Sequence, residues 1–165
     1  MVDILSEAEF KQWAAGRFAG ALDDPPSTAA YFALPTDAGR KLGAAELVIG
    51  LFEREAVAVW VKVVGVWPSC ENRCLAALAR SALGETRDIE DAPVHVFGVD
   101  DCDCAVAILA MCLYFFWDVV VAGEKSGLAV YFSHDEWVCA FGGDSARVAE
   151  VRAAFDMYGL ELKGP

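Results

Sequence analysis

The segment Ala56–Trp67 constrains the fold more than any other part of the sequence. It reads AVAVWVKVVGVW, and Lys62 is its one charged residue. β-Branched and aromatic residues favour strands, and a strand without polar alternation is typically covered on both faces. We therefore expect a central strand here, with further structure packed on each side of its sheet.

A second apolar run predicts a buried helix. From Cys104 to Trp117 all 14 residues are apolar or aromatic. A membrane-spanning helix needs about 20 such residues, so this length is more typical of a core helix. Asp100 or Asp101 is placed to cap a helix over about 102–117, where carboxylates suit the positive end of the helix dipole.

The remaining pattern predicts an α+β fold. Ser6 and Glu9 have the capping-box spacing ahead of a helix over about 7–18. A helix from about 37 to 52 is expected to bury Leu42, Ala45 and Ile49. Further helices are expected over about 70–83 and after 145, and strands over about 31–35, 93–97, 118–122, 128–133 and 136–141.

This order predicts one domain over residues 1–165. We expect a mostly antiparallel sheet of about four to five strands with helices packed on it, in which residues 93–97 form an edge strand. The N-terminal helical segment 1–35 is a candidate for a peripheral position.

The charge balance excludes one large class of function. The chain has 25 acidic and 13 basic residues, a net charge of -12. General nucleic-acid binders need clustered Lys and Arg, so we expect no nucleic-acid partner. A hydrophobic fraction of 56% excludes a disordered chain.

Residues 85–103 carry half of the net charge. Seven carboxylates stand against Arg87 alone, which gives a local charge of -6. Such a field attracts a basic partner, whereas the alternatives are a solvated connection with helix capping, or calcium binding. The candidate partner-binding residues are Asp88, Glu90, Asp91, Asp100, Asp101 and Asp103.

Six cysteines admit three interpretations. They stand at positions 70, 74, 102, 104, 112 and 139, in a chain that starts without a secretory signal pattern. Reduced thiols that act as small buried hydrophobes are expected first. A zinc site of Cys70, Cys74, Cys102 and Cys104 is the second interpretation, although its spacing departs from ordinary zinc motifs. A reactive Cys70 at a helix start is the third.

Two further groups of charged residues are candidate sites. His134 stands beside Asp135 and Glu136 and is a candidate general base or metal ligand, against the alternative of an ordinary polar turn. In an extended segment His134 and Glu136 share a face, and Asp135 does not. Arg40 and Lys41 near a helix start either hold an anion or form a solvated face. The other histidine, His95, is expected on the edge strand.

Two short strings carry a resemblance. Trp67-Pro68-Ser69-Cys70-Glu71-Asn72 and Ser133-His134-Asp135-Glu136-Trp137 resemble strings in small bacterial proteins without an assigned activity. The similarity covers about residues 30–142. It implies a soluble bacterial protein and transfers no catalytic residue.

From these observations we expect an acidic protein–protein interaction domain of the inhibitor, immunity or adaptor type. It is expected to be cytoplasmic, to need no cofactor, and to form a homodimer that covers apolar surface. The alternative is a small enzyme or metal-binding protein that uses His134, Glu136 and Cys70.

Overall fold

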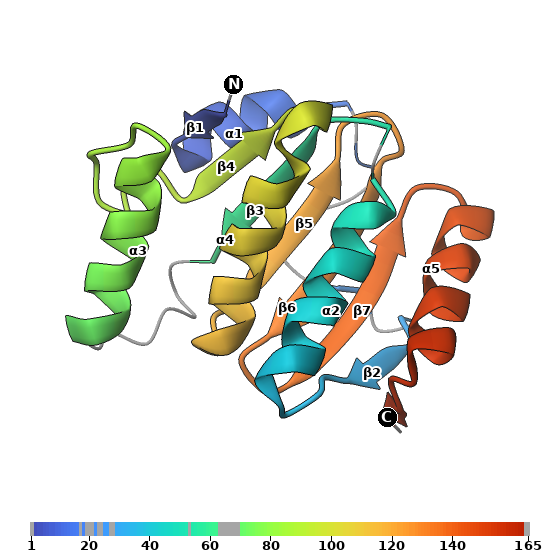
Figure 1. The fold of residues 1–165 in the computed structure, drawn as a ribbon. Coiled ribbons are helices and arrows are strands. Elements are labelled where there is room, and N and C mark those ends of the chain that lie inside the picture. Colours follow the sequence, from blue (N-terminus) through green and yellow to red (C-terminus); the bar gives the residue numbers. More distant parts are fainter. Residues whose placement is uncertain are drawn as a thin grey trace.

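The computed structural model describes residues 2–16, 18, 22, 25–26, 29–52, 54–62 and 70–163. Within them, an eight-stranded antiparallel sheet carries five α-helices (Figure 1). The strands are β1 (Asp3–Leu5), β2 (Tyr31–Ala33), β3 (Val57–Val61), β4 (Val94–Phe97), β5 (Val119–Gly123), β6 (Leu128–Ser133), β7 (Trp137–Gly142) and β8 (Leu162–Lys163). The helices are α1 (Glu7–Ala14), α2 (Ala38–Gly50), α3 (Cys70–Ala82), α4 (Cys102–Tyr114) and α5 (Ser145–Tyr158), and the short helix η2 (Val99–Asp101) precedes α4.

The α+β prediction is confirmed, but the predicted sheet of four to five strands is too small. The strand order is β1-β4-β3-β5-β6-β7-β2-β8, and each neighbouring pair is antiparallel. The prediction of β4 as an edge strand is wrong, because β1 pairs outside it with Asp3 opposite Val96. Strands of two or three residues, such as β8 and β1, are too short to show a periodic pattern.

The central strand is confirmed. All five residues of β3 and all five of β5 are buried, and the two strands pair from Val57–Gly123 to Val61–Val119. One face of the sheet packs under α2, α4 and α5, which Figure 1 shows lying across it. This first core includes Val48, Ile49, Val59, Leu109, Val121, Val130 and Phe155.

The other face of the sheet is covered by α1. Phe10 is 1% exposed and its ring centroid lies 5.1 Å from that of Trp60 on β3. The capping box is confirmed: the Ser6 hydroxyl accepts from the Glu9 N–H, and the Glu9 carboxylate accepts from the Ser6 N–H at 2.7 Å. The helix ends at Ala14, earlier than the expected residue 18.

Helix α2 turns a different face to the core than its sequence predicts. Asp37 caps it by accepting from the Arg40 N–H at 2.8 Å. Ala45 and Ile49 are buried as expected, but Leu42 is 44% exposed, and Lys41 is only 4% exposed. The helix is therefore rotated relative to the expected apolar stripe, and a lysine takes the place expected for a leucine.

Helix α4 ends three residues before the predicted end. The Trp117 N–H donates to the Cys112 carbonyl at 2.9 Å across a last turn in which Phe116 has a φ of +56°. This is the Schellman type of helix ending, in which glycine is the usual residue at the αL position. No helix in the described part of the chain combines the length and apolar character that crossing a membrane requires.

The C-terminal elements follow the sequence pattern closely. The strands expected over 118–122, 128–133 and 136–141 form β5, β6 and β7, which pair as two hairpins, and α5 stops at Gly159, whose φ is +80°. Two predictions lie outside the described residues: the part of the strand beyond Lys62 and the side chain of Cys70.

Candidate functional site

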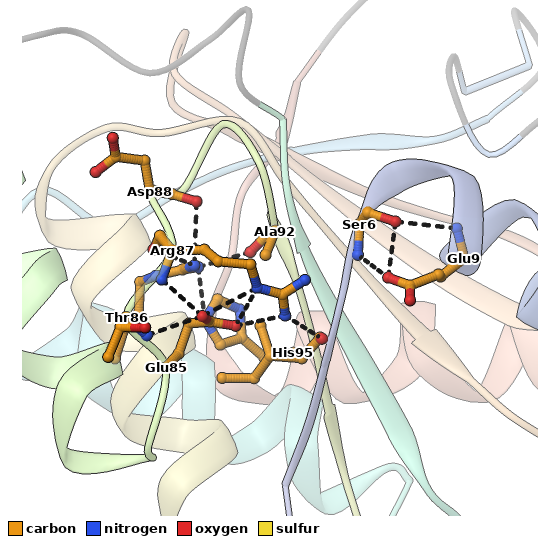
Figure 2. Close-up of polar contacts among 10 residues, drawn as sticks. Ser6, Glu9, Glu85, Thr86, Arg87, Asp88, Ala92 and His95 are labelled. Atoms are coloured by element: carbon orange, nitrogen blue, oxygen red, sulfur yellow. Dashed lines mark hydrogen bonds and ion pairs between the residues drawn. The ribbon is translucent and has the colours of Figure 1, made fainter.

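The glutamates of the acidic stretch 85–103 are paired with arginines. Arg87 donates through Nε to both carboxylate oxygens of Glu85 at 3.0 Å, and through Nη2 at 2.6 Å, as Figure 2 shows. These hydrogen bonds lower the pKa of Glu85 to about 2. Arg87 also donates to the Ile4 carbonyl at 2.8 Å, which ties β1 to this loop. Glu90 forms an ion pair with Arg73 on α3.

Four of the five aspartates of the same stretch are exposed, and Asp101 is half-buried. Asp88, Asp91, Asp100 and Asp103 form no salt bridge with any residue that the structure describes. They form two groups, one before β4 and one at the start of α4. A four-residue strand spans about 13 Å, which exceeds the Debye length of about 8 Å at physiological ionic strength. The acidic segment therefore presents two separate negative groups.

A buried arginine underlies the first acidic group. Arg80 on α3 is 2% exposed, and its Nη1 donates to the Ala92 carbonyl at 2.7 Å, while its Nη2 donates to the carbonyls of Arg87 and Asp88. The Arg80 guanidinium thus organises the loop from Arg87 to Ala92 through backbone carbonyls.

His95 completes this network, and its placement corrects the edge-strand prediction. It is 1% exposed, and its Nε2 lies 3.1 Å from Nη1 of Arg80. An arginine can only donate, so Nε2 accepts and the ring is neutral. Burial, followed by the charge of Arg80, lowers the pKa of His95 to about 4. This histidine is a structural acceptor and not an accessible base.

His134 and Asp118 form the second arrangement. The His134 N–H donates to Oδ1 of Asp118 at 2.8 Å, and the ring Nδ1 lies 3.0 Å from both carboxylate oxygens. The side chain of Asp118 is 12% exposed, and that of His134 is 35% exposed. The hydrogen bond with Asp118 raises the pKa of His134 above its usual value.

The surroundings of His134 differ from the expectation for a strand. Its Nε2 lies 3.5 Å from Asp135, the residue expected to point away. Residues 134–136 form the three-residue loop of the β6–β7 hairpin, so the two-residue alternation of a strand does not apply. Phe115, Phe116, His134 and Asp135 line an open depression of about 440 Å³.

Two residues with unusual backbone flank this depression. Phe116 and Glu136, with φ of +56° and +61°, are the non-glycine residues with positive φ in the described part of the chain. The Lys41 ammonium lies 3.6 Å from the centre of the Phe116 ring. The end of α4, the β6–β7 turn and the start of α2 therefore meet at one end of the sheet.

The five cysteines whose side chains the structure describes do not form a metal site. Among the described residues, no three His, Cys, Asp or Glu side chains form a group that could hold a metal. Cys74 is exposed on α3, Cys102 and Cys104 are half-buried on α4, and Cys112 and Cys139 are buried. Burial raises the pKa of each of these last two thiols to about 12, which makes them unreactive.

Sequence reasoning missed Asp118, Arg80 and the buried position of Lys41. Asp118 stood out only as the residue that interrupts a long apolar run. Arg80 and Lys41 gave no signal, because an arginine or lysine on a helix is usually solvated.

The network of Arg80 and His95 predicts acid sensitivity. The pKa of His95 is about 4 in the folded protein and about 6.5 in the unfolded chain. As the pH falls below about 6.5, the unfolded chain binds a proton that the folded protein does not, and the free energy of unfolding therefore decreases until about pH 4. Between about pH 8 and pH 5 the loss is about 2 kcal/mol. Urea unfolding at both pH values measures it. His95→Gln should remove this part of the pH dependence, and an unchanged dependence would contradict the assignment.

Comparisons with known proteins returned nothing to set beside this geometry. No protein-family model matches the chain, and neither the curated proteins nor the solved structures contain a match. The function is therefore argued from the residues and their arrangement.

Proposed function

We propose that the protein is an acidic interaction domain that binds a basic protein partner, in the manner of an inhibitor, immunity or adaptor protein. The observation that carries this proposal is the set of exposed aspartates Asp88, Asp91, Asp100 and Asp103, none of which forms an ion pair with a described residue. The negative potential of an exposed carboxylate that forms no ion pair attracts a basic partner.

The arginine pairs support the proposal because they fix the loop that displays these aspartates. Arg80 holds the backbone carbonyl of Asp88, and Arg87 joins the same loop to β1 and Glu85. A partner therefore meets carboxylates on an ordered backbone, and less conformational entropy is lost on binding. Electrostatic complementarity of this kind mainly raises association rates and selects the sign of the partner's charge.

The proposal predicts that the affinity for a basic partner depends on these particular aspartates more than on the net charge of the protein. The triple variant D88N/D91N/D100N should weaken binding of a labelled oligolysine peptide about tenfold at low salt, since each lost charge pair is worth up to about 1 kcal/mol. Fluorescence anisotropy at low and physiological ionic strength measures the dissociation constant, and the difference should shrink with salt.

The matched control is E46Q/D156N/E161Q. It removes the same number of charges from exposed carboxylates on other surfaces. This control should change the affinity by less than about twofold. Equal weakening by the two triple variants would show that oligolysine responds to net charge alone and would contradict a localised surface.

A second candidate function is general-base catalysis at His134. The observation favouring it is the His134–Asp118 pair: the carboxylate lies 3.0 Å from Nδ1, Nε2 lies 3.5 Å from Asp135, and His134 lines the open depression. A carboxylate oriented in this way fixes the tautomer and strengthens the base. No cysteine lines this depression among the described residues, so His134 would act on water and not on a neighbouring thiol.

Asp118→Asn tests this second function. The amide can still accept the His134 N–H, but the loss of charge should lower the pKa of His134 toward 6.5, as NMR titration of the two histidines would show. If His134 is a general base, the Asp118→Asn variant should hydrolyse p-nitrophenyl acetate at least about tenfold more slowly than the wild-type protein. Equal hydrolysis by both proteins would remove the enzymatic interpretation and leave the pair as a tie between β5 and the β6–β7 turn.

A further inference from the structure

Lys41 is a buried cation without a hydrogen-bonded partner among the described residues. Its side chain is 4% exposed, and no described acceptor forms a hydrogen bond or ion pair with Nζ. The ammonium contacts the Phe116 ring at 3.6 Å, and Glu136 attracts it from a longer distance. Nζ is not among the fully buried polar atoms that lack a partner, so the ammonium reaches the surface and can donate to an acceptor from outside the described residues.

Lys41 lies in the wall of an apolar groove. The groove runs between the start of α2 and the end of α4 and has a volume of about 320 Å³. Besides Lys41, it is lined by Ala38, Leu42, Ala110, Met111, Tyr114 and Phe115. Leu42 and Tyr114 are 44% and 58% exposed, so the groove is open to solvent and its apolar walls are uncovered.

The residues Phe116 and Ala38 lie next to Lys41 or to the groove. Phe116 occupies the αL conformation, which costs a non-glycine residue about 1–2 kcal/mol, and its ring is the group that lies against Lys41. Ala38, the first residue of the 13-residue helix α2, also lines the groove, and the carboxylate of Asp37 caps this end of the helix. Lys41 is the one basic side chain among the described residues that line the groove, so the groove is complementary to a single negative charge.

We propose that this groove binds a small carboxylic acid with an apolar body, its carboxylate on Lys41 and its chain over Leu42, Met111 and Tyr114. The carboxylate supplies the acceptor that Lys41 lacks, and the apolar chain covers the exposed walls. Charge complementarity selects an acid over an alcohol or an amine of the same length.

The other charged groups near the groove set the specificity. Glu136 and Asp135 on the β6–β7 turn disfavour a second negative charge, so a monocarboxylate fits better than a dicarboxylate. Arg40 is engaged with the carbonyls of Tyr158 and Gly159 and does not compete for the ligand. His134 on the same turn is paired with Asp118.

This site is separate from the acidic surface of the proposed function. Asp103 and Tyr114 stand near opposite ends of α4, whose 13 residues span about 20 Å. Neutralising the aspartates therefore leaves the groove intact, and the two proposals can fail independently.

Octanoate is the probe, with octanol and octylamine as ligands of matched length. Isothermal titration should show saturable binding of octanoate that is at least about tenfold tighter than that of octanol, because a charge-assisted hydrogen bond contributes about that factor. Lys41→Met should reduce octanoate affinity to that of octanol. Lys125→Met removes the same charge from an exposed turn residue and should change the affinity by less than about twofold.

A second measurement does not depend on the stability of the Lys41 variant. In the wild-type protein, saturating octanoate should raise the pKa of the Lys41 ammonium, followed by NMR of the side-chain amine, and octanol should not. Equal affinities for octanoate and octanol, or an unchanged Lys41 pKa with bound octanoate, would overturn the proposal. Absence of saturable octanoate binding would overturn it as well.

Discussion

The paired strands β3 and β5 are the constraint on which the rest of the structure depends. Every residue in both is buried, and their side chains alternate between two separate hydrophobic cores. Such a pair is stable only if apolar side chains cover both faces, because a buried strand brings its whole apolar surface out of water. Helices α2, α4 and α5 cover one face, and Phe10 and Trp13 of α1 cover the other.

This burial also determines where polar chemistry is placed. With both faces of the central strands covered, charged side chains gather at the strand ends and in the connecting turns. Asp118 precedes β5, His134 follows β6 and Lys41 lies at the start of α2, so these groups meet at one end. Asp100 and Asp103 lie beyond β4, at the start of α4. The two proposed sites are therefore consequences of the same sheet.

The sequence predicted the elements that have strong local signals. The valine-rich strand, the Ser6–Glu9 capping box and the three strands between 118 and 141 depend on local patterns of apolar residues or on capping residues at fixed spacing. The strands β1 and β8 depend on pairing with distant residues and were missed. The exchange of Leu42 for Lys41 on the buried face of α2 has the same origin, since Lys41 packs against Phe116, which follows the end of α4.

The candidate site was predicted only in part. His134 was singled out because of its chemistry, but its partner Asp118 lies sixteen residues earlier and is recognised only once β5 and β6 pair. Of the acidic residues, Glu90 was expected to face a partner and is paired with Arg73 instead. That pairing, like the contacts of Arg80 and His95, depends on how α3 packs against β4 and could not be predicted from local sequence.

Native-state hydrogen exchange tests the central claim most directly. If β3 and β5 hold the fold together, their backbone amides exchange only through global unfolding, with the free energy that urea unfolding gives, and amides of α1 and β8 exchange through smaller openings. If the amides of β3 exchange together with those of α1 at a lower free energy, the two covered faces are not interdependent and the account is wrong.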